Sequence, residues 1–311
     1  MNSPASRSTP FHARPMHKQS GPTVTIVICT RYNPVALRSC LEAIARLNPP
    51  ADDVLVVDNS EGDAKTKLVA SEFAVRYLVE AGAGLSRARN RGLTESSSEI
   101  VAYLDDDAMP RENWLEQILA PFADPRVASV TGDTIPPDAL RNASEHCSNR
   151  SLSNMDPQWF EIATFGGLGK GTNMALRKAA HSNWKGFDVR LGRGAPLRIA
   201  EESHAFASLL ALGYRAVHVP AAVVVHPSKP KNIEQEATSS IAYWLLLFFE
   251  FSGHRLELAR FLFRRLQGKS LDWPRDPQTP GAIVSSGWRV RLKAGLAGTL
   301  LYLRSRRLRE R

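Results

Sequence analysis

Several features that would point to particular protein classes are scarce or missing in this 311-residue chain. Its three cysteines, Cys29, Cys40 and Cys147, show no paired metal-ligand spacing, and an odd number without an export signal favours a reducing compartment. Residues 1–22 lack the continuous apolar core of a secretory signal, so we expect a loose N-terminal arm and a cytoplasmic protein. The apolar run Ile241–Phe249 is too short to cross a bilayer, which takes about 20 residues.

The net charge of +9 is concentrated near the C-terminus. Residues 254–311 hold 14 of the 40 Lys and Arg residues but only 4 of the 31 acidic ones, so the rest of the chain is nearly neutral. This basic end alternates with apolar stretches, which favours helices lying on an anionic membrane surface. A helical subdomain packed on the main domain is the alternative, and nucleic acid is not expected as a partner.

Strand-like and helix-like segments alternate over much of the chain. Apolar, β-branched runs at 24–29, 54–57 and 100–104 are separated by segments with helical spacing, which is typical of an α/β fold with a mainly parallel sheet and helices on both faces. Two further strands are expected at 215–219 and 222–225. We therefore expect an arm over 1–22, a catalytic domain over 23–228 and a basic helical region over 229–311.

Polar side chains follow three of these strands, at Thr30 and Arg31, at Asp58 and Asn59, and at 105–107. In parallel α/β sheets the carboxyl ends of the strands carry the binding site. Asp105 and Asp107 flank a single residue, so both can turn toward one hard divalent cation, which prefers oxygen ligands and is often shared with phosphates. The alternative is a solvated acidic turn before a helix that begins near Glu112.

An ordered set of short motifs resembles family 2 glycosyltransferases, which have the Rossmann-like GT-A fold. The set covers about 23–226 and consists of Val-Val-Asp-Asn-Ser at 56–60, Gly-Leu-Ser-Arg-Ala-Arg-Asn at 84–90, Leu-Asp-Asp-Asp at 104–107, Gly-Thr-Asn-Met-Ala at 171–175, Gly-Phe-Asp at 186–188, Glu-Glu at 201 and His-Pro at 226. The resemblance implies a nucleotide-diphosphate sugar donor bound by the first half, an acceptor bound by the second, and inversion at the anomeric carbon. A glycan or a lipid-linked acceptor at the inner face of the cytoplasmic membrane would fit the basic region.

The resemblance also implies roles for residues of the donor half. Asp58 matches the carboxylate that reads the base or ribose, with Thr30 and Arg31 beside it. Further donor-binding positions are Arg87, Arg89, Asn90, Asp105 and Asp106. Arginine presents a fixed fork of donors that suits phosphate oxygens. Without the resemblance, Arg87 would be one residue of an exposed helix face, and Arg89 would simply pair with an acid.

The metal and the catalytic base are implied by residues from three parts of the chain. Asp105, Asp107 and His226 match the ligands of Mn²⁺ or Mg²⁺, and an imidazole ligand favours Mn²⁺. Glu202 stands where relatives have a catalytic Asp, with Glu201 before it. The longer side chain of Glu moves the carboxylate by about a bond length relative to Asp, and a misplacement of about 1 Å can cost on the order of 10²-fold in rate. The alternative is therefore a catalytically degenerate domain that serves as a membrane-associated scaffold or nucleotide-binding module. A purely structural explanation also exists, because acidic residues such as Glu201 and Glu202 stabilise the N-terminus of a helix.

The acceptor side is less well defined. Trp184 and Asn173 are the expected acceptor-side residues, although a core role is common for any single aromatic side chain. The glycine-rich stretch 166–171 lacks the Walker spacing, which excludes a P-loop. Sugar nucleotidyl transfer is disfavoured because residues 30–33 are not the glycine-rich signature that it requires after the first strand.

Overall fold

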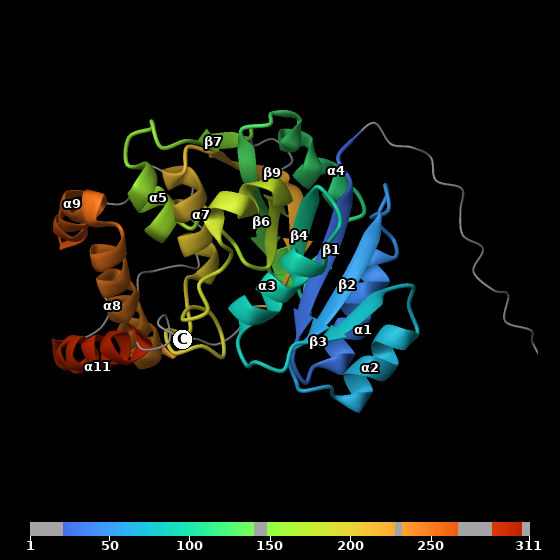
Figure 1. Cartoon of the computed structure of the whole chain (residues 1–311), viewed down its shortest axis with the longest axis horizontal. Helices are drawn as coiled ribbons and strands as arrows, with labels where there is room; N and C mark the ends of the chain where they lie inside the picture. The colour runs from blue at the N-terminus through green and yellow to red at the C-terminus, as the bar shows by residue number, and fades with distance from the viewer. Residues whose placement is uncertain (1–20, 140–147, 228–231, 267–287, 307–311) are drawn as a thin grey trace, which may run out of the picture.

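The computed structural model describes residues 21–139, 148–227, 232–266 and 288–306, and its centre is a nine-stranded sheet. The strand order is β3-β2-β1-β4-β8-β6-β9-β5, and β7 pairs with β9 (Figure 1). The strands are β1 Val24–Thr30, β2 Asp53–Asp58, β3 Arg76–Val79, β4 Ile100–Asp105, β5 Met109–Pro110, β6 Val127–Ile135, β7 Arg150–Leu152, β8 Asn173–Arg177 and β9 Arg215–Val225. Cys147 and residues 1–20 of the expected arm lie outside the described residues.

The sheet is parallel in its first half and mixed in its second. Strands β3, β2, β1 and β4 run parallel, as the alternating sequence pattern predicts. The antiparallel strand β8 then joins β4 to β6, and β6 runs parallel to β9. The expected strand pair at 215–225 is wrong, because these residues form the single strand β9, whose register against β6 shifts between Gly132 and Thr134.

Helices cover both faces of the sheet. They are α1 Pro34–Ile44, α2 Ala64–Ser71, α3 Leu85–Glu95, α4 Trp114–Leu119, α5 Trp159–Phe165, α6 His181–Trp184, α7 Glu201–Ala211, α8 Ile233–Glu250, α9 Arg255–Leu266 and α11 Trp288–Arg306. One hydrophobic cluster includes Leu37 of α1 and Trp114 of α4, and the other includes Ala88 of α3 and Phe206 of α7. The predicted α/β architecture is therefore confirmed.

The ends of β1, β2 and β4 lie side by side. Thr30 is the register partner of Asp58, and Cys29 is the partner of Asp105. The N–H of Asn59 donates to the carbonyl oxygen of Thr30 at 2.8 Å. The expectation that the three polar strand ends share one edge is confirmed.

The basic C-terminal region packs on the domain before it. Tyr243 and Leu246 of α8 belong to the same buried cluster as Phe160 of α5. The buried Arg190 donates to Asp188 and, at 2.5 Å, to Glu250 at the end of α8. Figure 1 shows α8, α9 and α11 at the end of the molecule opposite α1 and α2. Helices are present where the sequence predicted them, and α8 contributes to the core.

Asn173 at the start of β8 joins three elements. Its side-chain amide donates to the carbonyl oxygens of Asp133 at 2.8 Å and Ala222 at 2.7 Å, and its oxygen accepts from the Trp114 indole at 2.8 Å. The side chain is completely buried. These bonds satisfy one backbone carbonyl of β6 and one of β9, and the bond to the β9 carbonyl is fully buried.

Removal of this amide should destabilise the fold. Asn173→Ala leaves two carbonyl oxygens and an indole N–H buried without these partners, at about 1–3 kcal/mol for each group. We expect the free energy of unfolding, measured by urea titration, to fall by about 3 kcal/mol or more. The exposed Asn183 is the control, and Asn183→Ala should change it by less than about 0.5 kcal/mol. Equal stability of the two variants would contradict this role.

Candidate active site

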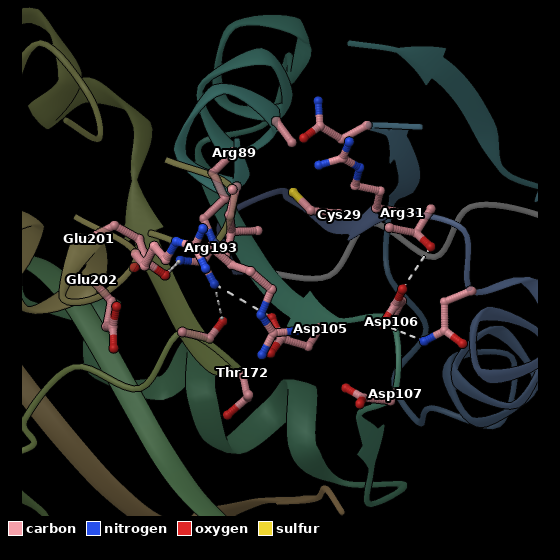
Figure 2. A pocket seen from close by; sticks show the side chains of 18 of the residues that line it. Cys29, Arg31, Arg89, Asp105, Asp106, Asp107, Thr172, Arg193, Glu201 and Glu202 are labelled. Atoms are coloured by element: carbon pink, nitrogen blue, oxygen red, sulfur yellow. Dashed lines mark hydrogen bonds and ion pairs between the residues drawn. The ribbon is translucent and has the colours of Figure 1, made fainter. Parts of the chain in front are cut away.

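A cavity of about 490 Å³ opens at the carboxyl ends of β1 and β4. Its walls come from the end of β1, the acidic turn after β4, the start of α3, and the segment 193–202 that leads into α7 (Figure 2). The charged residues that line it are Arg31, Arg89, Asp105, Asp106, Asp107, Arg193, Arg198, Glu201 and Glu202. Residues more than 150 positions apart in the sequence thus share one pocket.

Asp105, Asp107 and His226 form a cluster at one side of this pocket. One ligand atom from each lies within 4.8 Å of the others. The His226 Nε2 atom is 2.9 Å from Asp107 Oδ1 and 3.8 Å from Asp105 Oδ2. The cluster forms because Met109 of β5 pairs with Val225 of β9, which places His226 beside the acidic turn. Two carboxylates and one imidazole suit Mn²⁺ or another divalent cation, so the donor set fits a metal.

Asp106, between the two, turns toward β1. Its carboxylate accepts from the Thr30 hydroxyl at 2.7 Å and from the Asn33 amide at 3.1 Å. Burial, aided by the neighbouring Asp107, raises the pKa of Asp106 above its ordinary value. Thr30 and Asp106, both expected to bind the donor, therefore bind each other. Asn33 precedes α1, and its side chain makes no capping hydrogen bond to that helix.

Arg89 is buried and bridges acids from both halves of the domain. Its guanidinium is 2.6 Å from Glu201 Oε1 and 3.5 Å from Asp105 Oδ1, and it donates to the Gly171 carbonyl oxygen at 3.0 Å. A side chain at position 171 would meet this guanidinium at 2.5 Å, which explains the glycine. Arg89 lines the pocket, but its charge is already shared by two carboxylates.

Glu202 lies next to Glu201 at the start of α7 and also lines the pocket. Burial raises the pKa of the Glu202 carboxyl well above its ordinary value, the negative charge of Glu201 adds to this, and Arg89 opposes it. A carboxyl group with a raised pKa is a stronger base once it is deprotonated, and a pKa near the working pH suits proton transfer. Cys29 is another pocket residue, but burial raises the pKa of its thiol to about 12, so it stays neutral.

Three expected donor-binding residues stand outside the pocket lining. Asp58 is fully buried and accepts from Ser60 N at 2.9 Å and from the Tyr77 hydroxyl at 2.5 Å. Asn90 exchanges two hydrogen bonds with the backbone of Phe187, at 2.7 and 2.8 Å. Arg87 is exposed on α3. In this structure the polar atoms of Asp58 and Asn90 make hydrogen bonds within the fold.

The two expected acceptor-side residues also lie elsewhere. Trp184 is buried and packs edge-on against Phe187, with ring centroids 5.0 Å apart. Asn173 is fully buried and serves the junction of three elements described above. Neither lines the pocket, and in this structure both side chains pack within the fold.

Arg193 and Arg198 line the pocket, although the sequence analysis gave them no role. The sequence signal that could have found them is the pair of glycines around Arg193, since Gly192 and Gly194 both adopt positive φ. Arg198 and Ala200 also have positive φ, at 47° and 66°. Such conformations cost about 1–3 kcal/mol for a residue other than glycine and cluster at functional sites.

The chain also resembles known proteins. Relatives include a pre-mycofactocin glycosyltransferase of Mycobacterium tuberculosis, 34% identical over 126 residues (40% of this chain, 26% of the relative). A probable glycosyltransferase of Bacillus subtilis is 26% identical over 271 residues (80% and 60%). The matches thus span about a quarter and about three fifths of these relatives.

Solved structures share the fold. A mannosyltransferase from Pyrobaculum calidifontis, determined with GDP-Man and Mn²⁺, superposes with a TM-score of 0.58 at 18% identity, covering 91% of this chain and 87% of that one. This likeness shows the GT-A fold. The family model described as glycosyl transferase family 2 matches residues 25–184, about half of the chain. With the acidic cluster and the fold, this match shows that the chain belongs to glycosyl transferase family 2.

Proposed function

We propose that this protein transfers a sugar from a nucleotide-diphosphate donor to a hydroxyl acceptor with inversion, in one displacement step. The observation that carries the proposal is that Asp105 and Asp107, which form a carboxylate–imidazole cluster with His226, line the same pocket as the half-buried carboxyl group of Glu202. The first can hold a cation that binds a diphosphate, and the second can take a proton from an acceptor.

The proposed metal ligands are Asp105, Asp107 and His226, and the ion is Mn²⁺ or Mg²⁺. When bound, a divalent ion supplies Lewis-acid stabilisation of the charge that develops on the departing nucleoside diphosphate. The histidine favours Mn²⁺, and the similar mannosyltransferase structure contains Mn²⁺ with GDP-Man. Arg89 holds Asp105 in place through its 3.5 Å contact, so its proposed role is support for this cluster.

Glu202 is the proposed general base, and Glu201 the residue that fixes its surroundings. The 2.6 Å contact with Arg89 commits Glu201 to a buried ion pair, which leaves Glu202 as the carboxyl group able to accept a proton in the pocket. Its raised pKa supports this role. The extra methylene relative to the family's Asp is compatible with proton transfer if the acceptor hydroxyl sits correspondingly farther from α7.

The proposed acceptor is a glycan or a lipid-linked sugar, reached at an anionic membrane surface. No helix among the described residues is long and apolar enough to span a bilayer. The face of α11 opposite α8 nevertheless exposes Leu296, Leu300 and Leu303, each at least half exposed, and α9 exposes Leu256 and Phe263. Exposed basic residues accompany them, namely Arg255, Arg260, Lys293, Arg304 and Arg306. Apolar side chains flanked by cations fit the interface of an anionic bilayer.

The alternative is a domain that binds nucleotide sugars without turning them over. A panel of nucleotide-diphosphate sugars with Mn²⁺ separates the two, with nucleoside diphosphate release as the readout. Release from at least one donor supports the enzyme, and donor binding without release from any of them supports the scaffold.

Loss of one proposed metal ligand should weaken Mn²⁺ binding. We expect Asp107→Ala and His226→Ala to weaken Mn²⁺ binding at least about tenfold in calorimetric titration, because each removes one of three protein ligands. Asp138 is exposed and lies outside the cluster, so Asp138→Asn should bind Mn²⁺ as the unaltered protein does. Unchanged Mn²⁺ affinity in Asp107→Ala would remove the metal assignment.

If Glu202 is the general base, kcat should depend on the protonation of its carboxyl group. Protonated Glu202 cannot accept a proton, so kcat should fall as the pH drops through its raised pKa, at a pH above the ordinary range of glutamate. Glu202→Gln should bind donor normally and lose about 10²- to 10⁴-fold in kcat. Glu201→Gln removes the negative charge that raises this pKa, so the acidic limb should move to lower pH. Full turnover in Glu202→Gln would place the base elsewhere.

The membrane surface can be tested with vesicles. The full chain should sediment with phosphatidylglycerol vesicles more strongly than with phosphatidylcholine vesicles. The double variant Phe263→Ser, Leu300→Ser should bind at least about tenfold more weakly, because two apolar side chains no longer enter the bilayer. Leu68 is comparably exposed on α2, far from this region, and Leu68→Ser serves as the control. Equal binding by both variants, or preference for DNA over vesicles, would contradict the proposal.

A further inference from the structure

Three arginines line the pocket without an ion-pair partner among the described residues. Arg31 follows β1, and Arg193 and Arg198 belong to the segment before α7; all three are exposed. Figure 2 shows Arg31 and Arg193 at the pocket. By contrast, Arg89 is buried and held by two acids, and Arg91, outside the pocket, pairs with Glu95 at 3.0 Å. Among the described arginines of the pocket, Arg31, Arg193 and Arg198 therefore supply the positive charge that is not paired with an acid.

The backbone fixes the segment that carries Arg193. The Arg193 carbonyl oxygen accepts from the N–H of Leu85, the first residue of α3, at 2.8 Å. A side chain at Gly194 would meet the Cα of Gly84 at 3.2 Å, so the two backbones are in close contact. The segment thus comes from the acceptor half of the chain but rests on the donor half. Its arginines are held at the pocket, and Arg198 adopts its unusual φ of 47° there.

The charge of the pocket requires cations beyond the metal. Five carboxylates and four arginines line it. If all five carboxyl groups are ionised, Arg89 and a divalent cation leave the lining formally at about minus two, which repels a diphosphate. With Arg31, Arg193 and Arg198 the lining becomes formally about plus one. The three arginines turn the pocket from one that repels phosphate into one that attracts it.

We propose that Arg31, Arg193 and Arg198 form an anion-binding group that takes a phosphate or diphosphate ester in the same pocket as Asp105 and Asp107. Guanidinium groups bind phosphate oxygens through paired hydrogen bonds. The proposal rests on the proposed function and deepens it, since the pocket offers two sources of such an anion. One is the diphosphate of the sugar donor, and the other is the phosphate of a lipid-linked acceptor.

The test measures binding and does not need turnover. Calorimetric titration of the full chain with inorganic pyrophosphate in the presence of Mn²⁺ probes the donor source. Titration with farnesyl monophosphate probes the acceptor source. The variant Arg193→Gln, Arg198→Gln should weaken one or both by about tenfold to a hundredfold, and Arg31→Gln should add to the loss. Arg91→Gln, which alters an exposed arginine of α3 outside the pocket, should match the unaltered protein.

The outcomes separate this proposal from the proposed function. Weakened pyrophosphate binding assigns the arginines to the donor, and weakened farnesyl phosphate binding alone assigns them to the acceptor. If the arginine variants bind both probes as tightly as Arg91→Gln, while Asp107→Ala loses pyrophosphate, the anion group is overturned and the metal site stands. Melting temperatures within a few degrees of the unaltered protein would show that the variants are folded, as expected for exposed side chains.

Discussion

Mutual repulsion among carboxylates is the constraint on which the architecture of this pocket depends. Strand β4 ends in Asp105, the turn after it holds Asp106 and Asp107, and α7 adds Glu201 and Glu202 to the same cavity. Different groups stabilise the individual carboxylates. Arg89 neutralises Glu201 and supports Asp105, hydroxyl and amide groups hold Asp106, and His226 faces Asp107. Burial and the charge of Glu201 hold the pKa of Glu202 well above its ordinary value, which suits its proposed role as a base.

Arg89 connects the two halves of the catalytic domain through this charge balance. Its guanidinium contacts an acid that follows β4 and an acid that begins α7, so the proposed metal site and the proposed base share one cation. Behind α7, Arg190 joins Asp188 to Glu250 of α8, and His204 of α7 lies 3.8 Å from the same Glu250. The C-terminal region thus supports the helix that carries Glu202, in addition to its proposed role at a membrane.

Sequence reasoning reached the fold and the positions of the strand ends, because local periodicity determines both. The polar residues after the 100–104 strand pointed to Asp105 and Asp107, and the resemblance to family 2 glycosyltransferases added His226 to them. Sequence reasoning did not predict the contacts that some of the expected site residues make with partners far away in the sequence. The side chains of Asp58 and Asn173 form hydrogen bonds with other residues of the fold, and Trp184 packs against Phe187. Arg193 was missed because its position depends on a loop contact with α3, and the glycines on either side of it were not used as a signal.

The most direct test of the central claim is electron–nuclear double resonance of Mn²⁺ in the complex with a nucleoside diphosphate. If Asp105, Asp107 and His226 hold the ion that binds the leaving group, the spectrum should contain both a phosphorus coupling and a nitrogen coupling. Labelling histidine with ¹⁵N should change the nitrogen coupling, and His226→Gln should remove it. A phosphorus coupling without any histidine nitrogen, or a nitrogen coupling that survives in His226→Gln, would contradict the account.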